Sequence, residues 1–259
     1  MRIQISDKKK KDTFISIFQL LKCCTNAIHL TFDPEFIYIQ GMDKSHICLF
    51  DIKISKPWFA AYDIKEITKI SFDTNIFYSI ISTKSDNQDF IIQMKPDDQD
   101  TLYINFTQQE AKKAADFKKS FKMALIEYEY EEMAIPDTEY DAEFSLSSKQ
   151  ISDIFSQLEN FGNDIRVECT EEDIKLVTKG DNGEMQVDIP IEDLTGYSIV
   201  EGEKVELTYS LTYINKMCIT NKLSNDIEFS LSNDRPMKIG YNLGNNSTMT
   251  FFIVPKMKD

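Results

Sequence analysis

The sequence predicts an α+β protein made of two tandem copies of one domain, in which each copy is a β-α-β-β-β unit repeated twice. The first observation is an internal repeat, because the hydrophobic pattern of residues 14–106 recurs without a gap at a constant shift of 137 residues. The second is the apolar spacing, which switches between a helical period and a period of two within each copy. Chance agreement explains one matching helix but not a constant shift over this length.

The first copy opens with an alternating stretch, residues 1–5, that is typical of a strand. Asp12 or Thr13 can then cap a helix, because apolar residues follow at helical spacing. These helical positions are Phe14, Ile17, Phe18 and Leu21. Alternating runs come next and predict strands at Ile28, Leu30 and Phe32, at Ile37 and Ile39, and at Cys48, Phe50 and Ile52.

A second helix is expected from Asp73-Thr74 onward, followed by two or three more strands. Its inward side is expected to carry Ile76, Phe77, Ile80 and Ile81. In the second copy, Ser147 and Gln150 form a capping-box pattern, and Gly162 can end that helix. The last helix is expected to carry Tyr213, Ile214, Met217 and Cys218.

The repeat places domain boundaries at 1–123 and 141–259, with a connector at 124–140. The connector is acidic, lacks glycine and ends in Ile135-Pro136 before a short polar stretch. A residue that precedes proline is biased away from helix, so we expect an extended segment that runs over the surface.

The charge is strongly negative, with 29 Lys and Arg against 43 Asp and Glu and a net charge of −14. Any DNA contact therefore needs positive charge gathered on one face. Three predicted helices, 13–26, 74–85 and 211–223, carry lysine and no acidic residue, whereas 148–161 has Lys149 against two acids. Such faces can meet a polyanion or be neutral solvated surfaces. For any one helix, a neutral solvated surface is the better interpretation. The recurrence of such faces in so acidic a chain favours contact with a polyanion.

Several function classes are disfavoured by composition. The five cysteines form no C-x-x-C pair and the chain has two histidines, so a zinc site or a histidine-based triad is not expected. The chain has eight glycines and no phosphate-binding glycine loop. No apolar run approaches the roughly 20 residues of a membrane helix. We therefore expect no enzyme, no metal, no cofactor and no membrane association.

Five landmarks then resemble one family in the order of the chain. Residues 42–49, Met-Asp-Lys-Ser-His-Ile-Cys-Leu, resemble the M-D-x-S-H-V-x-L stretch of the proliferating cell nuclear antigen (PCNA) sliding clamps. Residues 134–140 resemble the end of that family's connector, 211–215 its fourth-helix motif, 234–237 its D-x-P-L turn and 251–256 its C-terminal Y-Y-L-A-P-K. The resemblance covers the full chain.

The resemblance implies the DNA-clamp (processivity) fold, in which three chains close head-to-tail into a ring with helices inside and sheets outside. It implies a DNA polymerase processivity factor that encircles double-stranded DNA without reading sequence. The DNA-facing candidates are Lys8, Lys9, Lys10, Lys11, Lys22, Lys84, Lys149, Lys216 and Lys222. The run Lys8–Lys11 is expected to precede the first helix, where it can contact phosphates or act as a solubilising loop.

The resemblance also implies an outer hydrophobic pocket under the connector. In the family it receives a short 3₁₀ turn with one aliphatic and two aromatic anchors, helped by strand-like pairing with the connector. The matching residues are Met42, His46, Ile47, Leu49, Met133, Ile135, Pro136, Tyr140, Pro236, Phe252, Val254 and Pro255. Taken alone, most of them would be ordinary core or edge residues.

The subunit contact implied by the resemblance pairs an edge strand near 114–124 of one chain with one near 185–189 of the next. Lys118, Lys119 and Lys122 could then face Glu184 and Asp188. The implied partners are double-stranded DNA, two further copies of the chain, a DNA polymerase, a clamp loader and other proteins with PCNA-interacting peptides.

Two alternatives stay open: a clamp-like interaction hub that does not encircle DNA, and one subunit of a heterotrimeric clamp. Richness in Lys, Ile and Asn suggests an AT-biased genome, such as that of a protist or a large DNA virus. The expected location is the nucleus, or a cytoplasmic replication site if the source is viral.

Overall fold

The computed structural model describes residues 1–108, 117–181, 183–218 and 220–256. Its contacts divide the chain into two compact units. The first unit comprises Met1–Lys44, Asp51–Met133 and Leu243–Thr248, and the second comprises Ser45–Phe50, Ala134–Asn242 and Met249–Asp259. Each unit therefore takes one short segment from the sequence half that mainly builds the other.

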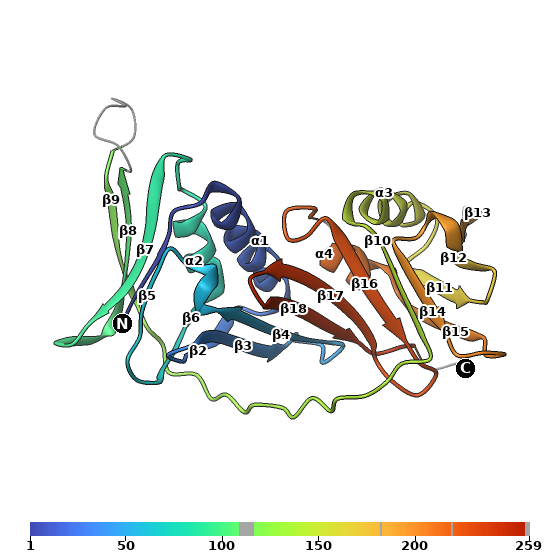
Figure 1. Ribbon diagram of the computed structural model, residues 1–259, viewed down its shortest axis with the longest axis horizontal. Helices are drawn as coiled ribbons and strands as arrows, with labels where there is room; N and C mark the ends of the chain where they lie inside the picture. The colour runs from blue at the N-terminus through green and yellow to red at the C-terminus, as the bar shows by residue number, and fades with distance from the viewer. Residues whose placement is uncertain (109–116, 182, 219, 257–259) are drawn as a thin grey trace. The chain divides into compact units, whose positions relative to one another are not determined.

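The two units repeat one order of elements (Figure 1). The first half contains β1 (Arg2–Ile5), α1 (Lys8–Cys24), β2 (Ala27–Phe32), β3 (Phe36–Met42), β4 (Cys48–Ser55), β5 (Ala61–Asp63), β6 (Thr68–Asp73), α2 (Thr74–Ile81), β7 (Gln88–Lys95), β8 (Asp98–Gln108) and β9 (Lys119–Ala124). The second half contains β10 (Ala142–Ser147), α3 (Ser148–Leu158), β11 (Asp164–Cys169), β12 (Asp173–Gly180), β13 (Gly183–Pro190), β14 (Gly196–Ile199), β15 (Val205–Ser210), α4 (Leu211–Cys218), β16 (Asp226–Leu231), β17 (Met237–Gly244) and β18 (Ser247–Ile253).

The predicted α+β fold with a twice-repeated β-α-β-β-β unit is confirmed. The structure adds one short strand to each copy, β5 or β14, after a single 3₁₀ turn at Lys56–Trp58 or Ile191–Asp193. Three residues are too few to show a period of two, which is why the spacing did not reveal β5.

The strands form three sheets. Neighbouring strands follow the orders β5-β1-β7-β8-β9, β14-β10-β16-β17-β18-β4-β3-β2-β6 and β13-β12-β11-β15. Along most of these strands buried and more exposed residues alternate, so one sheet face packs on the core and the other meets solvent.

Helix pairs cover the buried sheet faces, with α1 packed on α2 and α3 on α4 (Figure 1). In the first unit the pair encloses an aromatic cluster in which the ring centroids of Phe18 and Phe77 lie 4.6 Å apart and those of Phe72 and Phe77 lie 4.5 Å apart. Trp58 is fully buried beside this cluster, and its indole Nε1–H donates to the carbonyl oxygen of Leu243 at 3.0 Å.

Two helix predictions need correction. The first helix begins at Lys8 rather than after Asp12, because the carboxylate of Asp7 accepts from the backbone N–H of Lys10 at 2.8 Å and caps it. On α2, Asp73 caps the helix as expected, and the buried residues are Thr74, Phe77 and Ile81. Ile76 was expected to point inward. Because the helix turns Thr74, Phe77 and Ile81 toward the core, the Ile76 side chain points outward and is 53% exposed.

Gly180 marks a point where the second unit permits no side chain. A Cβ at Gly180 would lie 2.2 Å from the carbonyl oxygen of Phe161, which follows α3, and that oxygen belongs to backbone that cannot swing away. Gly240 on β17 is different, because its Cβ would meet the Glu228 Cβ at an ordinary 3.6 Å.

We expect Gly180→Ala to lower the free energy of unfolding by about 1–3 kcal/mol, the usual cost of overpacking. Gly240→Ala is the matched control, and it should change stability by less than about 1 kcal/mol. Urea unfolding followed by circular dichroism measures both. Equal midpoints for the two variants would contradict the close approach of Phe161 to Gly180.

Candidate nucleic-acid and partner interfaces

The lysine run Lys8–Lys11 lies inside α1, not ahead of it, and its four side chains make different contacts. Lys8 and Lys9 are exposed, and the Lys8 Nζ forms an ion pair with Asp86 at 2.5 Å. The Lys10 Nζ donates to the carbonyl oxygen of Trp58 at 2.7 Å. The run therefore offers two outward ammonium groups and one that is partly committed.

Lys11 and Lys84 are structural rather than DNA-facing, which corrects the prediction for both. Lys11 is 1% exposed and donates to the carbonyl oxygens of Asp86 and Gln88 at 2.7 and 2.5 Å. Burial is the main cause that lowers its pKa. The Lys84 Nζ contacts the carboxylates of Asp12 and Asp86 at 2.6 and 3.0 Å, and its side chain is 10% exposed. Together these contacts tie the start of α1 to the loop after α2.

The remaining helix lysines lie at the surface. The Lys22 Nζ lies 3.9 Å from the ring centroid of Tyr78, so α2 supplies an aromatic face that orients a lysine of α1. On α4 the exposed Lys216 Nζ lies 5.5 Å from the ring centroid of Tyr213. Lys149 on α3 and Lys222 after α4 are also exposed. The sequence pattern gave no indication of the two tyrosines, because tyrosine at a half-buried helix position is common.

Hydroxyl groups near these lysines are turned back to their own helix. The Ser79 Oγ donates to the carbonyl oxygen of Asn75 at 2.8 Å, and the Ser82 Oγ donates to that of Ser79 at 3.0 Å. In the second unit the Asn215 Nδ2 donates to the carboxylate of Glu159, just after α3, at 2.5 Å, while Asp153 within α3 is exposed. The helix surfaces are thus weakly positive, with few charges.

Several predicted pocket residues belong to the second unit. The Val254 N–H donates to the carbonyl oxygen of Ile47 at 3.1 Å, so the C-terminal strand continues beside residues 45–50. Val254 is 42% exposed. The other half-buried members in this unit are Leu49, Ile135, Tyr140, Phe252 and Pro255, while Pro136, Pro236 and His46 are exposed. His46 has a left-handed φ of 56°, which turns the chain before β4.

Two predicted pocket residues, Met42 and Met133, belong to the first unit. Both are half-buried. Met133 is held there by Gln40, a residue that the sequence reading did not single out. The Gln40 Oε1 accepts from the Met133 N–H at 2.8 Å, and the Gln40 Nε2 donates to the Met133 carbonyl oxygen at 2.8 Å. Gln40 shares the alternation phase of the half-buried Tyr38 rather than that of the buried Ile37 and Ile39, so no sequence pattern marked it.

The predicted subunit-contact strands are both end strands of their sheets. β9 ends the order β5-β1-β7-β8-β9, and β13 ends the order β13-β12-β11-β15. The part of the predicted strand at 114–116 lies outside the described residues. On β9, Lys122 is exposed, whereas the Lys119 Nζ donates to the carbonyl oxygen of Thr83, and Lys118 just before the strand is exposed.

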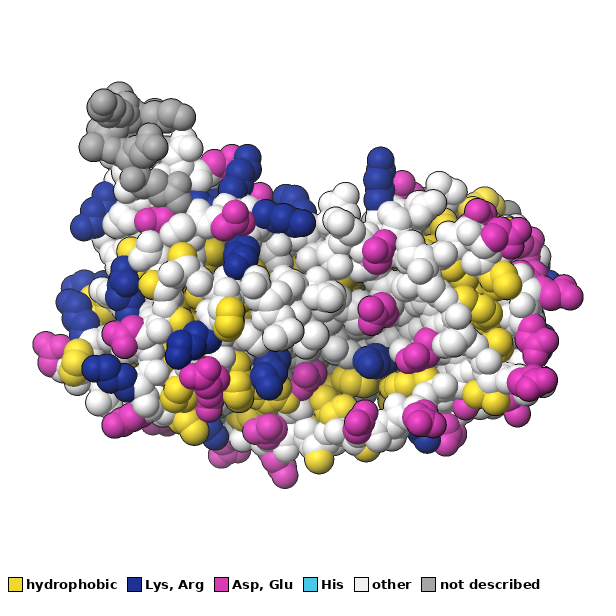
Figure 2. Space-filling view, viewed as in Figure 1, with side chains coloured by type: hydrophobic (Ala, Val, Ile, Leu, Met, Phe, Trp, Pro, Cys, Tyr) yellow, Lys and Arg dark blue, Asp and Glu magenta, His cyan; other side chains and the backbone are white. Residues whose placement is uncertain are grey.

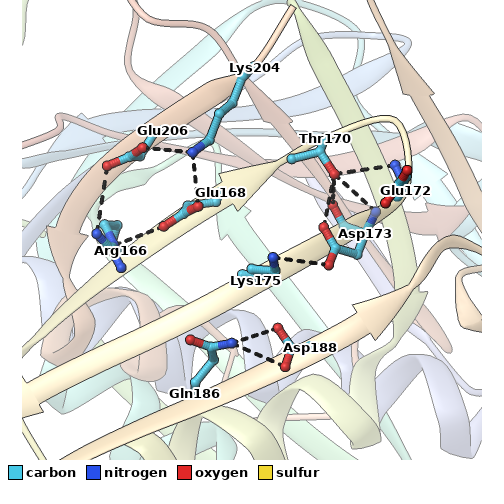
Figure 3. A network of polar contacts seen from close by, with 10 residues as sticks. All are labelled: Arg166, Glu168, Thr170, Glu172, Asp173, Lys175, Gln186, Asp188, Lys204 and Glu206. Atoms are coloured by element: carbon cyan, nitrogen blue, oxygen red, sulfur yellow. Dashed lines mark hydrogen bonds and ion pairs between the residues drawn. The ribbon is translucent and has the colours of Figure 1, made fainter.

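Charges on the β13 sheet are balanced internally except toward the edge (Figure 3). Arg166 and Lys204 each contact Glu168 at 3.1 Å, and Lys204 contacts Glu206 at 3.1 Å. Asp188, on the edge strand, instead accepts from the neutral Gln186 amide at 2.9 and 3.1 Å. Its negative charge is therefore oriented by an amide and remains available to an approaching cation.

Basic and acidic side chains are unevenly distributed on the face drawn in Figure 2. Lys and Arg side chains gather on the first unit, and acidic side chains predominate on the second. Among the described residues, no cluster of His, Cys, Asp and Glu could hold a metal ion, and no helix is long and apolar enough to cross a membrane.

Comparison with known proteins decides the family. The family model for the PCNA N-terminal domain matches residues 9–132, and that for the PCNA C-terminal domain matches residues 134–256. The chain belongs to the PCNA family. It is therefore a DNA sliding clamp, and the clamps of this family are not enzymes.

Individual relatives span nearly the whole chain. Proliferating cell nuclear antigen 1 of Plasmodium falciparum is 26% identical, covering 94% of this chain and 93% of that protein. Proliferating cell nuclear antigen of Chaetomium thermophilum is 26% identical over 86% of each chain. The crystal structure of the Entamoeba histolytica antigen superposes with a TM-score of 0.86 at 20% identity, covering 99% of this chain and 98% of that one, and so shares the fold.

A half-buried histidine, His29, packs against the connector of this clamp. The His29 ring stacks on Tyr130 with centroids 4.5 Å apart, and its Nδ1 lies 3.0 Å from the Ser71 hydroxyl. Burial lowers the His29 pKa below its ordinary 6.5, with Lys69 acting in the same direction and Glu132 opposing. The unfolded chain therefore binds a proton at higher pH than the folded chain.

We expect the free energy of unfolding to fall as pH drops below about 6.5 and to level off below the folded pKa of His29. His29→Phe keeps the stacked ring and should reduce the loss of stability between pH 7.5 and 5.5. Asp51 has a pKa raised chiefly by burial, so its titration stabilises the fold toward low pH and has the opposite sign. Urea midpoints at the two pH values test this. The same pH dependence in both proteins would contradict it.

Proposed function

We propose that this clamp works as a homotrimeric ring that encircles double-stranded DNA and tethers replication proteins by their peptides. The observation that carries the proposal is that β9 and β13, one in each unit, each lie at the end of a sheet. An edge strand with free backbone groups is a template for another strand, and covering it by a second copy removes the exposed edge.

The repeat within the chain suggests how the copies would join. β9 has the place in the first half that β18 has in the second, and β13 has the place that β4 has in the first. β18 and β4 are themselves hydrogen-bonded neighbours. The same pairing is therefore available to β9 of one chain and β13 of the next. Because that contact joins two different surfaces, repeating it can close a ring.

Charge supports this pairing. Lys118 and Lys122 are exposed at β9, while Glu184 and Asp188 are exposed on β13. Exposed ion pairs contribute only about 0–1 kcal/mol each, so they would set direction and register more than affinity. The half-buried apolar residues Phe121, Met185 and Val187 on the same two strands would supply most of the stabilisation.

DNA binding would use the surface lysines of the helix pairs. The proposed set is Lys8, Lys9, Lys10, Lys22, Lys149, Lys216 and Lys222, with Lys11 and Lys84 withdrawn. Contacts to phosphate carry no sequence information, which suits a protein that slides. With few charges, retention on DNA would depend on closure of the ring more than on affinity. We place this activity in the nucleus, or at a cytoplasmic replication site if the source is viral.

Native mass tests the ring first. Light scattering across a dilution series should give about 90 kDa, three times the 30.0 kDa of one chain. Lys118→Glu with Lys122→Glu should shift the protein toward smaller species, since like charges would then face one another. Adding Glu184→Lys and Asp188→Lys to that variant should restore the trimer at unchanged net charge. A constant 30 kDa species would overturn the ring and favour a monomeric hub or a heterotrimer.

DNA affinity measured against salt concentration tests the helix surface. Lys22→Ala with Lys216→Ala should weaken binding to double-stranded DNA and reduce the slope of log K against log salt by about 1 or more. Lys56→Ala with Lys204→Ala is the matched control, because it removes the same charge from two lysines outside the four α-helices, which pair with Glu35 and Glu168. Equal slopes in the two double variants would contradict the assignment of Lys22 and Lys216 to DNA binding.

A further inference from the structure

The solvent face of the second unit contains a hollow of about 350 Å³ over four neighbouring strands, β14, β10, β16 and β17 (Figure 1). Phe144 on β10 and Phe229 on β16 are buried in the core, so the residues on either side of them along each strand point outward. The outward residues that line the hollow are Glu143, Ser145, Gly196, Ser198, Glu228, Ser230 and Lys238. None of them belongs to the candidate peptide pocket or to the helix lysines.

Small residues create this hollow. Two rows of facing residues cross the four strands, one made of Ser198, Glu143, Ser230 and Lys238 and the other of Gly196, Ser145, Glu228 and Gly240. A Cβ at Gly196 would lie 2.8 Å from the Ser145 Oγ, and one at Gly240 would lie 3.6 Å from the Glu228 Oε2. The Glu228 carboxylate therefore lies over a glycine on one side and beside a serine on the other.

The charged groups of the hollow are not paired with one another. The Ser230 hydroxyl donates to the Glu143 Oε1 at 2.9 Å. Among the described residues, no cation lies within ion-pair distance of Glu143 or Glu228, and no carboxylate lies that close to the Lys238 Nζ. Two carboxylates against one ammonium leave an excess of negative charge. A cationic group is therefore the ligand that the hollow favours.

The first unit shows what lies at the equivalent place. There β1 pairs with β5 and β7 as β10 pairs with β14 and β16, so Arg2 corresponds to Glu143 and Gln4 to Ser145. The Arg2 Nη2 donates to the Gln4 Oε1 at 2.8 Å, which places the guanidinium along this sheet face. One copy of the domain thus carries its own arginine on this surface, and the other has a carboxylate and a serine at the same positions.

We propose that the hollow is a docking site for an arginine side chain of a partner protein. A guanidinium has several N–H donors in one plane, which Glu143, Glu228 and the serine hydroxyls can accept together. A lysine ammonium carries the same charge as a compact and strongly hydrated group, and it matches two separate carboxylates less well. The site would give the clamp a second point of attachment that leaves the peptide pocket free.

Nuclear magnetic resonance on the full-length protein tests the site with a defined probe. N-acetyl-arginine methylamide is titrated into isotope-labelled, deuterated protein, and the backbone amide signals of Gly196 and Gly240 are followed. A probe of this size is expected to saturate these shifts with a Kd of about 1 mM. N-acetyl-lysine methylamide should bind at least about fivefold more weakly.

Three variants should change the Kd of the arginine probe in different directions. Glu228→Gln removes one carboxylate and should raise the Kd about tenfold. Lys238→Met removes the cation that competes with the probe and should lower the Kd about twofold to threefold. Glu192→Gln, at an exposed position on the 3₁₀ turn of the same unit, is the matched control and should leave the Kd unchanged.

A fourth variant fills the hollow from within the chain. Glu143→Arg with Ser145→Gln copies the arrangement of Arg2 and Gln4 in the first unit and should abolish binding of the arginine probe. If this double variant fails to fold, Glu228→Ile replaces it, because isoleucine is the residue at the equivalent place of the first unit. It should abolish binding as well.

The outcomes separate a built site from general attraction. Saturable shifts that Glu228→Gln weakens and Lys238→Met strengthens would support the site. Unmoved signals of Gly196 and Gly240 at probe concentrations up to about 50 mM would overturn it. A lysine probe that binds as tightly as the arginine probe would also overturn it, because attraction of any cation to an acidic surface would then suffice. None of these results depends on the ring or on the peptide pocket.

Discussion

The architecture of this clamp depends on one constraint, that every β-strand needs a partner on both sides or a means of protecting its edge. Within the chain, β18 meets this need by lying beside β4. Two of the strands that end a sheet, β9 and β13, occupy the places in the repeat that β18 and β4 occupy, and they lack such a neighbour. A protein with two complementary open edges either associates or must blunt them with charge, and here the charges are of opposite sign on the two strands. Self-association with a fixed direction is the simplest resolution.

The distribution of charge also matters for this clamp, because the chain is acidic and few of its lysines lie on the helices. The acidic surface favours solubility and keeps polyanions from most of the exterior, so the few lysines on the helices have a disproportionate effect on where DNA can bind. Some of those lysines also serve the fold: Lys11 and Lys84 hold the start of α1 to the loop after α2. A lysine that is buried, or that already pairs with two carboxylates, cannot also release a counterion from DNA.

The connector combines order with an absence of regular structure. It contains no assigned helix or strand, yet Gln40 pairs with it as a neighbouring strand would. Preorganisation of this kind lowers the entropy that a partner peptide loses on binding, and so raises affinity without adding a contact to the peptide.

The sequence by itself determined the fold class, the repeat and the order of strands and helices, because these follow from apolar spacing that local geometry converts directly into buried faces. It also indicated the family through short motifs such as residues 42–49. Tertiary structure alone decided which helix lysines are buried. Lys11 and Lys22 both lie on α1, and only the packing around them makes Lys11 buried and leaves Lys22 at the surface. It also decided the role of Gln40, because its partners lie about 90 residues away along the chain and no local pattern relates them. Spacing along the chain reports periodicity, whereas the partners of a polar group depend on contacts between distant segments.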